Sequence, residues 1–219
     1  MSALVGDHPL SPADRDEHPL AALRELVLSA RVDGASERCS MCAAPVPNDH
    51  PHLVDTVDRT IRCACRACHL LFSEPGAANG RYRQIPGRYR RVAGLDITER
   101  EWSELQVPVS LAFFFRHSGL DRVVAFYPGP AGATESLLPL DAWTRLSARH
   151  AELTDLEDDV EAVIVRLTAE DTEAFVVPID RCYALTGRLR MTWTGFDGGA
   201  EAHAEIDRFF DELRERTGA

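Results

Sequence analysis

Five of the six cysteines of this chain fall between residues 39 and 68, and this cluster constrains the fold more than any other feature. Four of them form the pattern C-x2-C-x22-C-x2-C, with the pairs Cys39/Cys42 and Cys65/Cys68. A C-x-x-C turn holds two thiolates about 3.5–4 Å apart, as two corners of a tetrahedron require when metal–sulfur bonds are about 2.3 Å. Two such pairs complete the shell, so the spacing predicts a four-thiolate metal site.

The residues between and after these pairs indicate how the site is built. Residues 52–55 and 60–65 are predicted to form a hairpin with a turn near Asp58, and the chain after Cys65 is predicted to form a short helix with Cys68 in its first turn. A knuckle, a hairpin and a helix that carries the last two ligands resemble the treble-clef type of zinc finger. The positive end of the helix dipole favours thiolates, which supports this arrangement.

The residues leave other ligands and another metal open. Cys63 could replace Cys65, because residues two apart on a strand share one face; we prefer Cys65 because it restores the two-residue spacing to Cys68. Three histidines are near enough in the chain to substitute for a cysteine: His50, His52 and His69. Zinc is the default ion for four thiolates, and iron, held as in rubredoxin, is the competitor. Neither C-x-x-C contains Pro or is followed by Gly, as rubredoxin knuckles usually are, which favours zinc in a structural role.

Composition excludes several classes of function. A net charge of −11 argues against general nucleic-acid binding, and all 24 basic residues are Arg. The longest apolar stretch, residues 107–115, is far too short to span a bilayer. The N-terminus has no secretory signal, and clustered cysteines fit a metal better than a disulfide scaffold. We therefore expect a soluble cytoplasmic protein.

Shifts in composition divide the chain into four parts. Residues 1–35 are interpreted as a disordered tail and a short amphipathic helix, and residues 36–74 as the metal module. Residues 75–106 are interpreted as an Arg-rich linker and a short helix, which is expected to begin with a capping box formed by Thr98 and Glu101. Residues 107–219 are expected to form an α+β domain.

The Arg-rich linker stands out in an acidic chain, because residues 81–91 contain five arginines and no acid. Arg and Tyr are favoured at interfaces, so the segment is a candidate contact surface for an acidic protein partner. Alternatively, its arginines pair with acidic residues of the same chain and attach the metal module to the main domain, which is the interpretation we prefer. The candidate partner-binding residues are Arg81, Arg83, Arg88, Arg90 and Arg91.

The C-terminal half contains a possible internal repeat. Residues 122–146 align without gaps on residues 161–185, and each unit is interpreted as strand, strand and helix, with Asp141 or Asp180 as the helix N-cap. These two ββα units and a hairpin around His117 predict a mostly antiparallel sheet with helices on one face. A final amphipathic helix is expected over residues 200–216.

Catalytic patterns are absent from the sequence. It contains no G-x-G-x-x-G, no G-x-S-x-G and no H-E-x-x-H. The acidic run at residues 155–161 is interpreted as a solvated turn, and Cys182 as a small buried hydrophobe. These observations favour a protein that is not an enzyme.

The two C-x-x-C pairs, the stretch Val-Val-Ala-Phe-Tyr-Pro-Gly-Pro-Ala-Gly-Ala-Thr-Glu-Ser and the stretch Val-Pro-Ile-Asp-Arg-Cys-Tyr together resemble an uncharacterised actinobacterial family. That family has only a domain-of-unknown-function label, and its genes tend to lie beside those for uptake [NiFe] hydrogenases. The resemblance covers roughly residues 36–216 and implies a hydrogenase accessory protein, whose partner is a hydrogenase subunit or a maturation factor. The alternative is a rubredoxin-like one-electron carrier with iron in the four-cysteine site. We expect loss of Cys39 or Cys68 to release the metal and unfold residues 36–74, while the C-terminal sheet stays largely intact.

Overall fold

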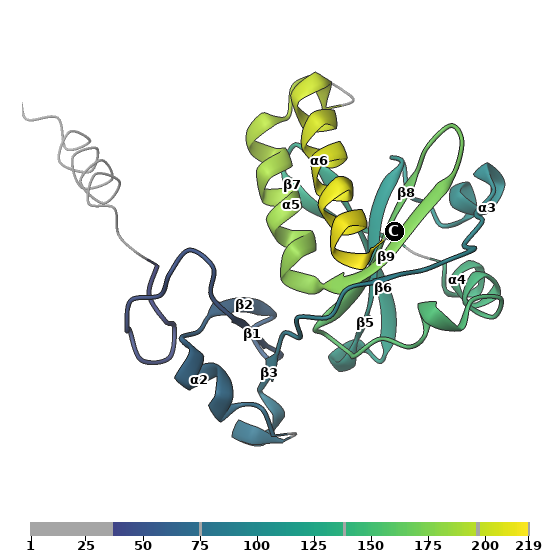
Figure 1. The fold of residues 1–219 in the computed structure, drawn as a ribbon. Coiled ribbons are helices and arrows are strands. Elements are labelled where there is room, and N and C mark those ends of the chain that lie inside the picture. Colours follow the sequence, from purple (N-terminus) through teal and green to yellow (C-terminus); the bar gives the residue numbers. More distant parts are fainter. Residues whose placement is uncertain (1–36, 75, 138, 196–197, 219) are drawn as a thin grey trace, which may run out of the picture. The chain divides into compact units, whose positions relative to one another are not determined.

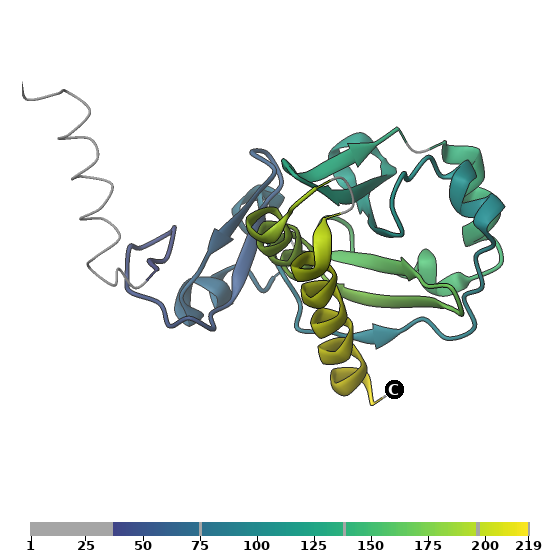
Figure 2. The same ribbon diagram turned by 90° about the horizontal axis from the view of Figure 1, so that it is seen from above.

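The computed structural model describes residues 37–74, 76–137, 139–195 and 198–218. The tail and the amphipathic helix expected within residues 1–35 lie outside this range. Residues Arg38–Ala219 form one unit, which contains helices and two separate antiparallel sheets (Figures 1 and 2). The expected mixture of helices with antiparallel sheet is confirmed.

The first sheet is small and belongs to the cysteine-containing part of the chain. Its strands lie in the order β2-β1-β3, and they are β1 (His52–Asp55), β2 (Thr60–Cys63) and β3 (Tyr82–Gln84). The predicted hairpin is therefore present, with Val54 opposite Ile61. Helix α2 (Arg66–Leu71) follows β2, and the 3₁₀ turn η1 (Ala77–Gly80) leads into β3. The segment expected to be a linker thus supplies the third strand of this sheet.

The second sheet has six strands in the order β4-β9-β8-β5-β6-β7, and all neighbours are antiparallel. The predicted hairpin around His117 is present as β5 and β6. The strands are β4 (Arg90–Arg91), β5 (Leu111–His117), β6 (Arg122–Gly129), β7 (Gly132–Ser136), β8 (Glu161–Leu167) and β9 (Thr172–Pro178).

Helices cover both faces of the large sheet, so the expectation of helices on one face is wrong. The helices are α3 (Glu99–Glu104), α4 (Leu140–Ser147), α5 (Ile179–Thr192) and α6 (Gly199–Thr217), with short 3₁₀ turns η2 (Ser118–Leu120) and η3 (Ala151–Leu153). Phe113 and Phe175 pack in one buried cluster with residues of α5 and α6, such as Phe209. Phe114 packs in a second cluster with Trp102 of α3 and Trp143 of α4. Because neighbouring residues of a strand point to opposite faces, the wholly apolar centre of β5 requires a cover on each side.

The helix starts confirm one predicted cap and correct two. Thr98 and Glu101 form the predicted capping box at the start of α3. The predicted caps Asp141 and Asp180 are not N-caps: the N-caps of α4 and α5 are Pro139 and Pro178, and both aspartates lie within the first turn. Their carboxylates still face the positive end of the helix dipole. Asp180 in addition accepts a hydrogen bond from a histidine of β1, as described below.

Candidate metal centre

The four cysteines of the two C-x-x-C pairs lie together, with their Sγ atoms all within 4.8 Å of one another. The Sγ atoms of Cys42 and Cys65 are 3.7 Å apart. A regular tetrahedron with metal–sulfur bonds of about 2.3 Å has an edge of about 3.8 Å, so this separation already matches a bound ion. Cys39 and Cys68 are buried, whereas Cys42 is exposed and Cys65 half-buried. The donor set therefore fits a four-thiolate metal ion.

Local backbone structure positions each pair. In the first pair, the Ala43 N–H donates to Cys39 O at 2.8 Å and the Cys39 N–H donates to Ala44 O at 2.8 Å, which folds the chain into a tight knuckle. Ala43 has φ = 60° in this turn, a left-handed conformation that favours glycine. In the second pair, Cys65 is the N-cap of α2, and its Sγ accepts a hydrogen bond from the Cys68 N–H at 3.4 Å.

Hydrogen bonds and burial spread the pKa values of the thiols. Burial raises the pKa of Cys39, but the backbone N–H groups of Cys65, Cys42 and Met41 outweigh it and lower the pKa to about 6. A hydrogen bond with Cys65 and burial raise the pKa of Cys68 to about 12. Without a bound cation, the Cys68 thiol therefore favours the protonated form near neutral pH. Metal binding at such a site displaces protons.

The alternative ligands lie elsewhere. Cys63 belongs to a second group of donor atoms, which it forms with His50 and His52. His69 belongs to neither group: its carbonyl accepts a hydrogen bond from Gln84 Nε2 at 2.5 Å, and its Nδ1 lies 3.2 Å from the same atom. Burial lowers the pKa of His69, which favours the neutral ring.

Arginines of the 81–91 segment form ion pairs within the chain. Arg81 binds both carboxylate oxygens of Asp55, with Nη2 2.9 Å from Oδ2, and this contact lowers the pKa of Asp55 to about 2. Arg88 binds Glu161 through two hydrogen bonds of 2.7 and 2.5 Å. Arg81 also contacts Asp58 Oδ2 at 2.9 Å. Two further pairs are Arg83–Asp159 at 3.6 Å and Arg90–Asp155 at 3.4 Å, while Arg91 is exposed.

These pairs correct part of the interpretation of residues 155–161 as a solvated turn. Asp155 and Glu157 are exposed, as expected, whereas Asp159 and Glu161 are buried. Their charges are compatible with burial because each faces an arginine of the 81–91 segment.

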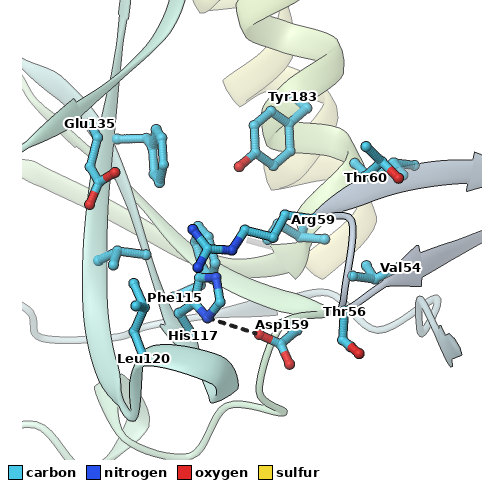
Figure 3. A pocket seen from close by; sticks show the side chains of 14 residues that line it. Val54, Thr56, Arg59, Thr60, Phe115, His117, Leu120, Glu135, Asp159 and Tyr183 are labelled. Carbon is cyan, nitrogen blue, oxygen red and sulfur yellow. Dashed lines mark ion pairs between the residues drawn. The ribbon is translucent and has the colours of Figure 1, made fainter. Parts of the chain in front are cut away.

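A cavity of about 200 Å³ lies where the β1–β2 hairpin meets β5, β6 and α5 (Figure 3). Its apolar wall includes Phe115 and Leu120. Arg59, from the turn of the β1–β2 hairpin, also lines the cavity. His117 and Asp159 face each other at its base, with His117 Nδ1 3.9 Å from Asp159 Oδ1. The volume is below the roughly 300 Å³ at which sites for drug-sized ligands begin. Its ionisable lining residues include Arg59, His117, Glu135 and Asp159.

Sequence reasoning missed this cavity, because its lining comes from distant parts of the chain. Tyr183 on α5 lines the cavity together with His117 on β5. Burial raises the pKa of Tyr183 to about 12, so its hydroxyl is protonated at neutral pH. Nothing in the local sequence around Tyr183 or His117 indicates that they share one cavity.

Two further observations bear on the class of protein. Among the described residues, the helices are too short or too polar to cross a membrane. Comparison with curated proteins and with solved structures finds no match. A family model does match residues 38–217, and on that match the chain belongs to DUF5947, a family of unknown function.

Proposed function

We propose that this protein is a non-catalytic accessory protein whose four-cysteine site holds zinc as a structural ion and which acts by binding another protein. The observation that carries the first half is the cysteine geometry: four Sγ atoms within 4.8 Å, one edge at the tetrahedral separation, and two ligands buried. Closed four-cysteine zinc sites of this kind stabilise small lobes that bury too little apolar surface to fold alone.

The finer description of the fold belongs to the same proposal. A knuckle at Cys39–Cys42, the β1–β2 hairpin and α2 with Cys65 and Cys68 at its start support a treble-clef-like lobe. The order β6-β7-α4 followed by β8-β9-α5 supports two related ββα units.

The proposed partner is a hydrogenase subunit or a maturation factor, and the proposed compartment is the cytoplasm, where thiols stay reduced. The proposed partner rests on the resemblance to a family encoded beside [NiFe] hydrogenases. A surface feature adds to it: Leu70 and Leu71, at the end of α2, are 58% and 71% exposed. Two adjacent exposed leucines on a metal-stabilised lobe suit contact with an apolar patch of a partner.

Iron is the alternative occupant, and the exposure of Cys42 favours it, because electron transfer requires a metal centre close to the surface. Four thiolates around iron would make a one-electron carrier. Zinc and iron differ visibly: iron gives thiolate charge-transfer bands that bleach on reduction, whereas zinc gives a colourless protein.

The test has two parts. Elemental analysis and a visible spectrum of protein purified without a histidine tag identify the metal; zinc without colour supports the proposal, and iron with charge-transfer bands replaces it with the electron carrier. Co-purification with separately expressed hydrogenase subunits and maturation factors then tests the partner. Leu71→Ser should weaken capture, whereas Met191→Ser, which removes an apolar side chain that is 87% exposed on α5, should not. No capture of any of these proteins by the wild type would refute the hydrogenase role.

A further inference from the structure

A second group of metal-ligand side chains lies at the end of the β1–β2 hairpin. His52 and Cys63 are directly opposite each other in the antiparallel register. The Ala64 N–H donates to Pro51 O at 2.9 Å, which continues the pairing beyond His52. His50 is two residues before His52, so an extended chain presents both rings on one face. One ring nitrogen from each histidine and the Cys63 Sγ all lie within 4.8 Å of one another.

The hydrogen bonds of both histidines place the proton on the same ring nitrogen, Nδ1. His50 Nδ1 lies 2.7 Å from the carbonyl oxygen of Pro47, which can only accept, so Nδ1 carries the proton. His52 Nδ1 lies 2.9 Å from Oδ2 of Asp180, in the first turn of α5. A neutral ring that donates from Nδ1 keeps the lone pair on Nε2. Metal-binding histidines are characteristically held in this way, by a backbone carbonyl or a carboxylate on the second nitrogen.

We propose that His50, His52 and Cys63 form a second metal site, separate from the four-cysteine centre, that binds a zinc-like divalent transition ion through two Nε2 atoms and one thiolate. Asp180 is a positioning residue, because it fixes the tautomer and orientation of His52. This site does not depend on which ion the four cysteines hold.

The donor types select the class of ion. Two imidazoles and one thiolate suit Zn²⁺, Co²⁺, Ni²⁺ or copper, whereas Mg²⁺ and Ca²⁺ require oxygen ligands. Three protein ligands leave the fourth tetrahedral position for water or another molecule, which is the arrangement of zinc sites that are not purely structural. His50 is buried, while His52 and Cys63 are half-buried.

The site should be weaker than the four-cysteine centre, since it offers one thiolate in place of four. Equilibrium dialysis against buffered free Zn²⁺, followed by elemental analysis, therefore suits it better than analysis of protein as purified. We expect the full-length protein to bind two zinc ions per chain in two separate steps. Absence of any metal ion beyond the one held by the four cysteines, across the whole range of free Zn²⁺, would overturn the proposal.

Variants assign the two steps. Cys63→Ser and His52→Gln should each abolish the weaker step and keep the tighter one, and the retained tight step shows that the lobe is still folded. Asp180→Asn should weaken the second step by about 10–100-fold without loss of the first. His203→Gln, which removes an exposed histidine of α6, is the matched control and should bind as the wild type does. Persistence of the second step in both Cys63→Ser and His52→Gln would also overturn the assignment.

Discussion

Removal of the Arg88 guanidinium is expected to destabilise the protein by about 3 kcal/mol, because its partner is fully buried. Glu161 is 0% exposed, and it accepts hydrogen bonds from Arg88 Nε at 2.7 Å and Nη2 at 2.5 Å. If Arg88 were removed, the carboxylate would still accept a hydrogen bond from the backbone N–H of Glu157, at 3.0 Å. Breaking a buried ion pair from one side costs roughly 3–5 kcal/mol. The Arg88 side chain is 45% exposed, so water can reach the vacated position, which places the expected loss at the lower end of that range.

Urea unfolding followed by tryptophan fluorescence measures this loss. Arg88→Met keeps the aliphatic stem, and Arg91→Met is the matched control at an exposed arginine three residues later, with an expected change within about 0.5 kcal/mol. Adding Glu161→Gln to Arg88→Met should recover part of the stability, because a neutral amide is cheaper to bury than an unpaired carboxylate. The reasoning is refuted if Arg88→Met and Arg91→Met are equally stable, or if the double variant is no better than Arg88→Met.

Two further predictions concern single positions. Ala43 adopts φ = 60° in the first knuckle, so Ala43→Gly should stabilise the metal-loaded lobe by about 0.5–1 kcal/mol. Ala44→Gly, at a position without positive φ, should not stabilise it. Competition with a chelator measures the difference between the two variants. Tyr183 has a pKa raised by burial from 10 to about 12, so its contribution to stability is complete below pH 10 and is lost as the pH rises toward 12, by up to about 3 kcal/mol. Alkaline unfolding should therefore be less steep in Tyr183→Phe, and equal pH dependence in the two proteins would contradict this.

The four-cysteine cluster could be predicted because its ligands come in two local pairs. Each pair is a short turn, so spacing alone brings Cys39 to Cys42 and Cys65 to Cys68. The second group, His50, His52 and Cys63, could not be predicted from sequence spacing. The sequence shows His50, His52 and Cys63 as possible substitutes at the first site, and only the strand register, with His52 opposite Cys63, gives them a site of their own.

Long-range packing accounts for most of what the sequence left undecided in the fold. The hairpins and the capping box at Thr98 are local, and the structure contains them. The wrong prediction of helices on one face has a different origin: the apolar residues at the centre of β5 are themselves a signal for burial on both faces of the sheet. The ion pair of Arg88 with Glu161 joins residues 73 positions apart, and no local pattern indicates it.

The packing of the metal lobe changes what metal loss should do to the large sheet. Val54 of β1 and Ile85, which follows β3, are buried in the same cluster as Phe113 and Phe175 of the large sheet. Burial of one such aliphatic side chain contributes about 1.5–3 kcal/mol, so unfolding of the lobe should cost the sheet several kcal/mol out of the 5–15 kcal/mol typical of a domain. The sheet is therefore expected to survive chelation in a folded state of lower stability. Trp102 and Trp143 report on the face covered by α3 and α4, away from the lobe. Their fluorescence during urea unfolding should show a lower midpoint after chelation or in Cys68→Ser, and an unchanged midpoint would mean that the lobe and the sheet are energetically independent.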